Sequence, residues 1–430
     1  MDELMENQEL PKKNVKIWQM IVAAIACLAL LLSLTVVVWW SIIGVKSFDE
    51  GMDAVSNLFH PTTAPTAPTT SPSQKPEDNK IFENRDAVVA TMGDAKLTNG
   101  QLQIYYWTSV IDFLKVNGNY IYYLGLDITR PMSEQPCYLD EYDTWQDFFL
   151  QDAWDDWHKY QAMALEAEKE DLKLPKDLQD TLDNLKTEME KVAKESGYDN
   201  VEALVQADYG PGCTFADYEA YMRVYFTGYN YFNEQIKKVD VGEQALSDYF
   251  DAHAEDLLEK GFKKDNSKVY AVRHILIDVV GTKTEGDKTV VTDEDWETCR
   301  KKAQDVLDEW LAGEHTEKTF GELAKKYSTD PGSNKDGGLY DGLDESTNFV
   351  TPFKDWYLDE NRKEGDYGLV KTSYGYHIMY HSSTELKWQA ECGRRIYDEA
   401  SAKVLEDVTK AHAITIDKSK AMIGFVDFSK

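Results

Sequence analysis

The feature that most constrains this chain is a long apolar segment near its N-terminus. Residues 17–45, IWQMIVAAIACLALLLSLTVVVWWSIIGV, contain no charged side chain. About 20 such residues in a helix cross the hydrocarbon layer of a bilayer, which is roughly 30 Å thick. Trp18, Trp39 and Trp40 fall near the two ends, where indole rings prefer the membrane–water interface. The sequence therefore predicts a transmembrane helix over residues 17–45.

The lysines beside this helix predict its orientation. Lys12, Lys13 and Lys16 precede the apolar run, and fewer lysines follow it closely. The positive-inside rule then places residues 1–16 in the cytosol and the bulk of the chain outside the plasma membrane. A cleaved signal peptide is the first alternative, although its apolar core is usually shorter. A lipoprotein signal on Cys27 is the second, although the apolar run continues well past that residue.

A linker over residues 46–80 follows the predicted helix. Its central part, HPTTAPTAPTTSPSQKPEDNK, repeats proline among threonine and serine. Proline lacks a backbone donor, and the hydroxyl residues bring little apolar area, so the segment cannot form a packed core. We expect a semi-stiff spacer that holds the remainder of the chain away from the membrane.

Charge and cysteine content exclude several kinds of partner. The formal net charge of −31 argues against nucleic acid, whose phosphates demand a basic patch. It also disfavours an anionic membrane surface as a partner for the bulk of the chain. No CxxC or Cys/His ligand spacing appears, so we expect no metal and no cofactor. Cys137 and Cys213 are the one pair considered for a disulfide, and free thiols are the default expectation.

Residues 81–267 carry a mostly helical pattern. DAVVATMGDAKLTNGQLQIYY predicts a short strand, a turn at residues 92–94 and a helix capped by Thr98 or Asn99. The next helix repeats large or small apolar residues at spacings of three and four: Trp145, Phe149, Ala153, Trp157 and Tyr160. We interpret this stripe as a buried helix face, and an exposed surface for unfolded chains is the alternative.

The C-terminal residues 385–430 return to helix and end in short β-prone pieces, AITI and AMIGFVDF. These pieces are too short to form a domain of their own. We expect them to pair with or pack on an earlier element, and the strand predicted at residues 87–92 is the obvious partner.

Between these parts, residues 269–384 have a different pattern. VYAVRHILID opens the stretch as a β-prone run, and YGLVKTS and GYHIMYH close it as two short strands. Three helical segments lie between them, so the order β-α-α-α-β-β predicts a small antiparallel sheet covered by helices. Strand alternation places His274 on one face with Val272 and Leu276. From chemistry alone, His274, His377 and the acidic, Gly-rich loop at residues 328–342 indicate only a possible polar cluster.

Several blocks of this stretch carry a family resemblance. RHILI, FGELAKKYSTDPGS, DGGL, TPF and KTSYGYHIM resemble, in order and spacing, the parvulin family of peptidyl-prolyl cis/trans isomerases. VVATMGDAKLTNGQLQIYYW resembles the start of the helical chaperone lobe of SurA- and PrsA-type foldases. The resemblance implies an α+β fold: a helical lobe made of residues 81–267 and 385–430, with an FKBP-like parvulin domain inserted at residues 268–384.

The parvulin pattern also implies a site. Its two histidines fall at His274 and His377, hydrogen-bonded near the hydroxyl of Thr372, and its acidic or thiol position falls at Asp330. The implied proline-binding cup consists of Leu339, Phe349, Val350, Phe353 and Met379. The sequence departs from the family where GGLYDG replaces the usual Gly-Gly-Asp-Leu-Gly and where STNFVTPF replaces the usual Gly-Gln-Met before Pro-Phe.

The function implied by the resemblance is non-covalent isomerisation of Xaa-Pro bonds in exported, unfolded polypeptides. The histidines would hold the geometry of the site, and Asp330 would tune the electrostatics near the substrate carbonyl. The loop has only Lys335 as a cation, so we expect no preference for phosphorylated substrates. The alternative is a membrane-tethered holdase whose parvulin domain is catalytically weak or inactive.

Overall fold

The computed structural model describes residues 83–426, except residues 119, 120, 122, 140, 141, 286 and 287. The transmembrane helix predicted at residues 17–45 and the linker at residues 46–80 lie outside this range. Within it, none of the helices combines the length and the apolar character needed to span a membrane. The chain divides into two compact units, one ending at Lys238 and resuming at Ser401, the other formed by Val239–Ala400.

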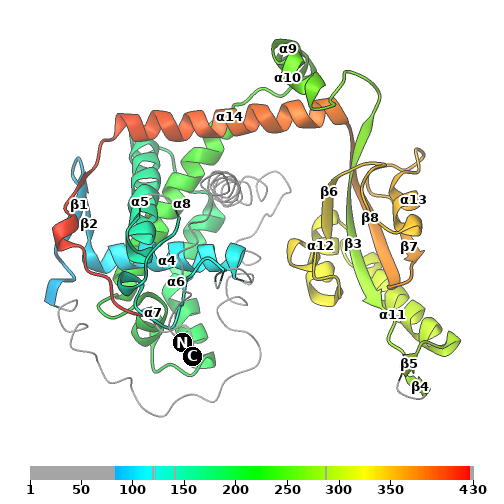
Figure 1. Cartoon of the computed structure of the whole chain (residues 1–430), viewed down its shortest axis with the longest axis horizontal. Coiled ribbons are helices and arrows are strands. Elements are labelled where there is room, and N and C mark those ends of the chain that lie inside the picture. The colour runs from blue at the N-terminus through cyan, green and yellow to red at the C-terminus, as the bar shows by residue number, and fades with distance from the viewer. Residues whose placement is uncertain (1–82, 119–120, 122, 140–141, 286–287, 427–430) are drawn as a thin grey trace, which may run out of the picture. The chain divides into compact units, whose positions relative to one another are not determined.

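The first unit is helical apart from a small sheet (Figure 1). Its elements in chain order are β1 (Val88–Met92), β2 (Ala95–Thr98), α4 (Asn99–Asn117), η1 (Met132–Glu134), α5 (Trp145–Lys169), α6 (Lys176–Glu195), α7 (Val201–Tyr209), α8 (Phe215–Ile236), the end of α14 (Lys387–Ala411), β9 (Thr415–Ile416) and η3 (Lys418–Lys420).

A hairpin opens this unit where the sequence predicted a strand, a turn at residues 92–94 and then a helix. β1 and β2 pair antiparallel with Met92 opposite Ala95, so the prediction missed β2. The helix cap was predicted correctly, because the side chain of Thr98 accepts a hydrogen bond from the backbone N–H of Gln101, and the side-chain oxygen of Gln101 accepts one from the backbone N–H of Thr98. This reciprocal capping box satisfies donors that the first helical turn leaves unpaired.

The aromatic stripe of α5 forms the core of the first unit. Trp145, Phe149 and Ala153 are fully buried, and Trp157 nearly so. Phe149 lies 5.4 Å from Phe113 of α4, measured between ring centroids. The interpretation as a buried helix face is therefore confirmed for these four residues, and they offer no surface to unfolded chains.

The C-terminal residues complete the first unit. β9 pairs antiparallel with β1, with Ala90 opposite Ile416, which confirms the predicted partner. The AMIGFVDF piece is not a strand where the structure describes it, up to residue 426. Instead, the backbone N–H of Met422 donates to Asn99 (3.0 Å) and that of Gly424 donates to Gln103 (2.8 Å). Two buried side-chain amides of α4 thus take the place of a partner strand.

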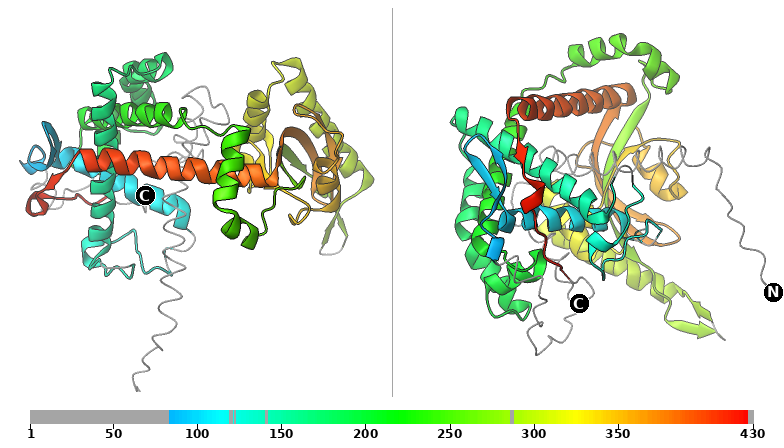
Figure 2. Two further views of the ribbon diagram at one scale, coloured as in Figure 1. Left: turned by 90° about the horizontal axis from the view of Figure 1, so that it is seen from above. Right: turned by 60° about the vertical axis from the view of Figure 1, so that its left-hand side comes forward.

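The second unit contains a four-stranded antiparallel sheet in the order β6-β3-β8-β7. Its elements are α9 (Glu243–Ala252), α10 (Ala254–Glu259), β3 (Lys268–Asp278), β4 (Lys283–Glu285), β5 (Lys288–Val290), α11 (Asp293–Ala312), α12 (Glu317–Tyr327), η2 (Asn334–Asp336), β6 (Leu339–Leu343), α13 (Thr351–Tyr357), β7 (Tyr367–Lys371), β8 (Gly375–Leu386) and the first part of α14. α14 itself is one continuous helix (Figure 2).

The predicted order β-α-α-α-β-β omits three of these strands. The β4–β5 hairpin extends from the sheet beyond α11 (Figure 2) and pairs only with itself. β6 is an edge strand with an irregular register against β3, and Gly342 within it has a φ of +64°. Short strands rich in glycine have low β propensity, so the sequence pattern alone indicated a loop there.

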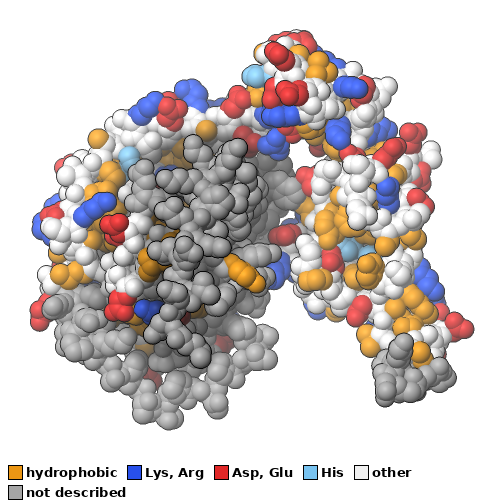
Figure 3. Space-filling view, in the orientation of Figure 1, with side chains coloured by type: hydrophobic (Ala, Val, Ile, Leu, Met, Phe, Trp, Pro, Cys, Tyr) orange, Lys and Arg blue, Asp and Glu red, His pale blue; other side chains and the backbone are white. Residues whose placement is uncertain are grey.

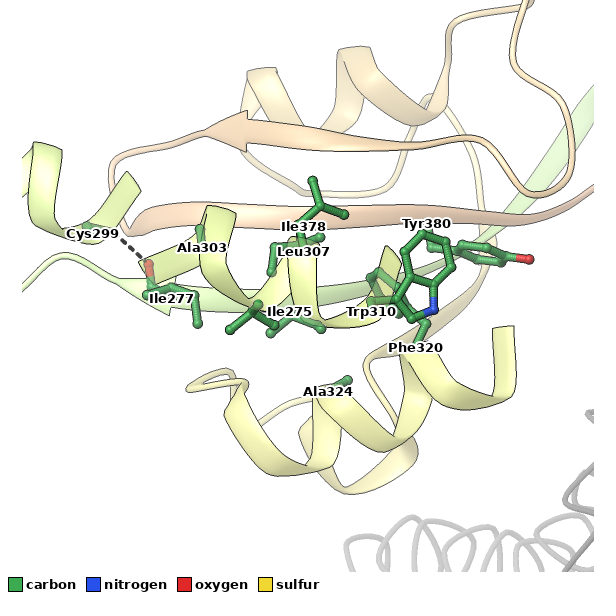
Figure 4. Packing of buried hydrophobic residues seen from close by; sticks show 11 residues of the cluster. Ile275, Ile277, Cys299, Ala303, Leu307, Trp310, Phe320, Ala324, Ile378 and Tyr380 are labelled. Atoms are coloured by element: carbon green, nitrogen blue, oxygen red, sulfur yellow. Dashed lines mark hydrogen bonds between the residues drawn. The ribbon is translucent and has the colours of Figure 1, made fainter. Parts of the chain in front are cut away.

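Two apolar clusters cover the two faces of this sheet. On one face, α11 and α12 pack on β3 and β8, and Trp310 and Phe320 meet Tyr380 (Figure 4). At the other end of that cluster the Cys299 thiol donates to the carbonyl of Ile277 (3.0 Å). Cys213, Cys299 and Cys392 are buried thiols without a disulfide, so the considered Cys137–Cys213 bond is not formed. On the other face, α13 packs on all four strands.

The two glycines before β6 bring the edge strand against β3. The backbone N–H of His274 donates to the carbonyl of Gly338 (2.7 Å). Gly338 has a φ of +75°, and a Cβ placed on it would lie 2.1 Å from the carbonyl oxygen of His274. Only glycine combines that conformation with so close an approach.

We predict that Gly338→Ala destabilises the second unit by more than the ~1 kcal/mol expected of left-handed strain alone. Gly342→Ala is the matched control, because Gly342 also has a positive φ (+64°) but no atom within 4 Å of an added Cβ. Urea unfolding followed by hydrogen exchange of peptides from β3 and β8 measures both variants. Equal losses in the two variants would contradict the close approach.

Candidate active site

Two buried histidines on adjacent strands form the centre of the site. His274 lies in the middle of β3 and His377 near the start of β8, and the register places Leu276 opposite His377. The two Nδ1 atoms are 3.0 Å apart, and the rings stack at 24° with centroids 5.2 Å apart. Both side chains are buried, so their polar atoms need partners within the protein.

Partners lie at both outer ends of the histidine pair. His274 Nε2 is 2.9 Å from the Asp330 carboxylate and 2.9 Å from the Ser333 hydroxyl. His377 Nε2 is 2.9 Å from the hydroxyl of Thr372. The structure therefore brings together the four residues His274, Asp330, Thr372 and His377 that the sequence placed at the centre, and adds Ser333.

The direction of these hydrogen bonds follows from the Asp330 carboxylate, which can only accept. His274 Nε2 must therefore carry the hydrogen, which leaves its Nδ1 as an acceptor. His377 then donates from Nδ1 and accepts from the Thr372 hydroxyl at Nε2. The opposite direction would place the lone pair of His274 Nε2 against a negative charge. One carboxylate thus orients the hydrogen bonds of both imidazoles.

The electrostatics agree with this arrangement. The hydrogen bond from His274 lowers the pKa of Asp330 well below its usual range, against the opposing effect of burial. Burial, followed by the proximity of His274, lowers the pKa of His377 to about 3. His377 is therefore neutral near pH 7 and suited to the donor and acceptor roles described above.

An apolar wall lies against the two imidazoles. Phe353 of α13 is almost fully buried, and its ring centroid lies 5.1 Å from that of His274 and 5.3 Å from that of His377. Phe349 stacks on Phe353 at 4.7 Å. Met379 is buried and Val350 partly buried in the same cluster. Figure 3 shows hydrophobic side chains gathered around a histidine on the visible face of the second unit.

The expectation for Leu339 is wrong, because β6 turns this residue away from the histidines. In the register, Leu339 lies opposite Arg273 and Tyr340 lies opposite Val272. Paired residues of antiparallel strands share a face, so Tyr340 joins the His274 face and Leu339 the opposite one. The ring of Tyr340 lies 4.9 Å from that of Phe349. Shifting the alignment of GGLYDG to the family pattern by one residue would have placed Tyr340, in place of Leu339, in the cup.

A buried arginine holds the loop that carries Asp330. Arg273 donates to Glu317 of α12 (2.9 Å) and to the carbonyl oxygens of Asp336 (3.0 Å) and Gly337 (3.2 Å). No local sequence pattern marks Arg273, although it directly precedes His274. Among the described residues, no group of three His, Cys, Asp or Glu side chains could hold a metal ion.

Comparison with known proteins identifies this domain. Residues 257–382 match the Rotamase_3 family, described as the PPIC-type PPIASE domain. Over 91 residues the chain is 36% identical to a putative peptidyl-prolyl cis-trans isomerase, Cbf2, of Campylobacter jejuni, covering 21% of this chain and 33% of Cbf2. Over 132 residues it is 33% identical to the foldase protein PrsA of Latilactobacillus sakei, covering 30% of this chain and 43% of that PrsA.

The chain thus aligns with less than half the length of these curated relatives. A crystal structure of PrsA from Bacillus subtilis is 17% identical, covers 76% of this chain and 90% of that one, and superposes with a TM-score of only 0.26. That superposition is too loose to carry an argument about the fold. The family match confirms the parvulin-type isomerase domain that the sequence motifs predicted.

We predict that the second unit loses stability as the pH falls from about 6.5 toward 4. The folded pKa of His377, about 3, lies below its unfolded value, so in this window the unfolded chain binds a proton that the folded chain does not. One such proton gives a slope of at most about 1.4 kcal/mol per pH unit. Asp330, whose pKa is also lowered, contributes only below about pH 4.

Urea unfolding at several pH values, read by hydrogen exchange of β3 and β8, measures this slope. His377→Asn should flatten it, because asparagine can still donate toward His274 but does not titrate. Part of the slope should remain, since burial also lowers the pKa of His381. The same slope in wild type and variant would disprove the role given to His377.

Proposed function

We propose that this protein, whose residues 257–382 are a PPIC-type peptidyl-prolyl isomerase domain, is a foldase that isomerises Xaa-Pro bonds in exported polypeptides. The observation that carries the proposal is the hydrogen-bonded line of Asp330, His274, His377 and Thr372 beside an apolar wall. A polar network that is fully paired within itself leaves the adjoining surface apolar, which suits a proline ring.

The chemistry required of such a site is modest. Rotation about an Xaa-Pro bond is slow because it breaks amide resonance, with a barrier of about 18–20 kcal/mol. A catalyst need only bind the twisted amide better than the planar one. The twisted form has less charge separation and loses less hydration in a dry site, so an apolar wall lowers the barrier without forming a covalent bond.

The hydrogen bonds support this non-covalent route. Both ring nitrogens of His274 and both of His377 have protein partners, and one oxygen of Asp330 faces three donors. No member of this line is left as an unpaired base or nucleophile. We therefore assign His274, His377 and Thr372 as positioning residues, and Asp330 as the charge that orients them and tunes the field at the substrate carbonyl.

The apolar residues next to this line are the proposed cup for proline. Phe349 stacks on Phe353, and Phe353 reaches the imidazoles, with Val350 and Met379 in the same cluster. The fully buried Phe353 also supports the fold, because Phe→Ala at such positions costs about 3–5 kcal/mol. Milder changes such as Phe353→Leu are therefore the appropriate probes of the cup.

We also propose the domain arrangement and location that the sequence predicts. Residues 17–45 would anchor the chain in the plasma membrane with residues 1–16 in the cytosol, and residues 46–80 would form the spacer. Residues 81–267 and 385–430 would make the chaperone lobe around the isomerase domain at 268–384. Pairing of β9 with β1 supports the joining of the two outer segments.

We predict that the full-length protein, purified in detergent, accelerates isomerisation of an Xaa-Pro peptide in proportion to its concentration. Asp330→Asn should lower kcat/KM by about tenfold and Asp330→Ala by more, since a charge-assisted hydrogen bond contributes about 1.5–3 kcal/mol. Asparagine keeps an acceptor for His274 but lacks the charge, whereas alanine lacks both.

Asp355→Asn is the matched control, because Asp355 is an exposed residue of the same domain and the change in net charge is identical. Its activity should equal that of wild type. No acceleration by the wild-type protein would favour the holdase alternative. Equal activity in wild type and both Asp330 variants would show that the site lies elsewhere.

We predict that a protease added to intact cells degrades residues 81–430 and spares a short fragment containing residues 1–45. The reason is the predicted orientation, in which only residues 1–16 lie in the cytosol. Antibodies against tags at the two ends would follow the digestion, with permeabilised cells as the control. Protection of the C-terminal tag in intact cells would refute the proposed location.

A further inference from the structure

Tyr340 is linked both to the polar line and to the apolar wall. Its hydroxyl donates to the Oδ2 atom of Asp330 (3.0 Å). Its ring stacks on His274, with centroids 5.4 Å apart and planes inclined by 26°. It also meets Phe349 edge to face at 4.9 Å. No other described residue of the wall reaches Asp330 through a hydrogen bond given by the structure.

The backbone places Tyr340 in this position by register. Opposite Val272 on the edge strand β6, Tyr340 takes the His274 face that the sequence assigned to Leu339. The side chain is partly exposed, so it lies between the buried line and solvent. Burial and the hydrogen bond to Asp330 raise the pKa of Tyr340 to about 12, so the phenol keeps its proton and remains a donor.

A glycine in the loop makes room for the phenol. A Cβ placed on Gly332 would lie 2.7 Å from the Tyr340 hydroxyl oxygen. It would lie 3.4 Å from the nearer oxygen of Asp330, which is an ordinary contact. The backbone N–H of Gly332 donates to that same oxygen, Oδ1 (3.1 Å), whereas the Tyr340 hydroxyl donates to Oδ2. The loop therefore accommodates the hydroxyl as well as the carboxylate.

We propose that Tyr340 has two separable roles in the isomerase site: its ring is a wall of the cup that contacts the substrate proline, and its hydroxyl positions the Asp330 carboxylate against His274. This inference rests on the proposed function and assigns it a further residue. The aromatic face suits the polarised C–H groups of a pyrrolidine ring. The hydroxyl acts only through Asp330 and contributes to turnover rather than to binding.

The two roles predict different kinetic effects for two substitutions. Tyr340→Phe keeps the ring and removes the hydroxyl, so KM should stay unchanged while kcat falls about three- to tenfold, as for the net loss of one ordinary hydrogen bond, because three other donors still hold Asp330. Tyr340→Leu removes the aromatic wall as well, so KM should also rise several-fold. Exchange NMR on an Xaa-Pro peptide at equilibrium, at several peptide concentrations, gives both constants.

Two further variants test the hydroxyl independently of residue 340. Gly332→Ala should displace the phenol and lower kcat as Tyr340→Phe does. Tyr327→Phe is the matched control, because Tyr327 also donates to a carboxylate, that of Glu309 (2.8 Å), in the same domain but away from the site. Its KM and kcat should equal those of wild type.

A second measurement does not depend on catalysis. The groups facing Asp330 are His274 from β3, Gly332 and Ser333 from its own loop, and Tyr340 from β6. Losing one of these donors destabilises the carboxylate. The carboxyl ¹³C signal of Asp330 should therefore titrate at higher pH in Tyr340→Phe and Gly332→Ala than in wild type and Tyr327→Phe.

The outcomes separate the two proposals. A wild-type protein without isomerase activity would overturn the proposed function, while the titration of Asp330 would still test the hydroxyl. A KM increase in Tyr340→Phe as large as that in Tyr340→Leu would overturn the division of roles. Wild-type kcat together with wild-type titration of Asp330 in Tyr340→Phe would overturn the positioning role of the hydroxyl.

Discussion

The hydrogen bond between the Asp330 carboxylate and His274 is the constraint on which the rest of the site depends. Because the carboxylate can only accept, it fixes where the hydrogen lies on His274, and that in turn fixes His377 and the hydroxyl of Thr372. A charge on one loop thereby orders groups on two strands and a turn. Other parts of the fold support this hydrogen bond. Arg273 binds the backbone of the loop that carries Asp330, and Gly338 allows the edge strand β6 to approach His274.

Much of this arrangement could be predicted from the sequence, for a physical reason. Strand alternation alone placed His274 on one face of its strand with Val272 and Leu276, and helix caps such as Thr98 carry their own local chemistry. The pairing of β9 with β1 was predicted because two short, β-prone pieces had no other partner. The assignment of Asp330 to the site came only from the family motifs. An acidic residue in a glycine-rich loop can equally cap a helix, stabilise a turn or face solvent.

The features that escaped prediction depend on register or on distant contacts. Whether Leu339 or Tyr340 faces the histidines is decided by one residue of register on a glycine-containing edge strand, where a slip of one position exchanges the two faces. Ser333 and Arg273 act through partners in other segments, Ser333 on His274 and Arg273 on Glu317, which no local pattern reveals. The side-chain amides of α4 that bind the C-terminal residues likewise depend on distant contacts that the local sequence does not reveal.

Those amides have a consequence for the order in which the chain folds. Asn99 and Gln103 hold backbone groups that are more than 320 residues further along the chain. Residues 239–400, by contrast, form a unit from one uninterrupted segment. A nascent chain emerging from its N-terminus can complete that inner unit while the outer one still waits for Met422 and Gly424. The entropy cost of closing a loop grows only slowly with its length. The time before the outer unit can close is therefore set by synthesis of the C-terminal residues, and the entropy of bringing the two ends together adds little to it. The outer unit is thus the first to begin and the last to close, and truncating the chain before Met422 removes the backbone donors that Asn99 and Gln103 of its first helix bind.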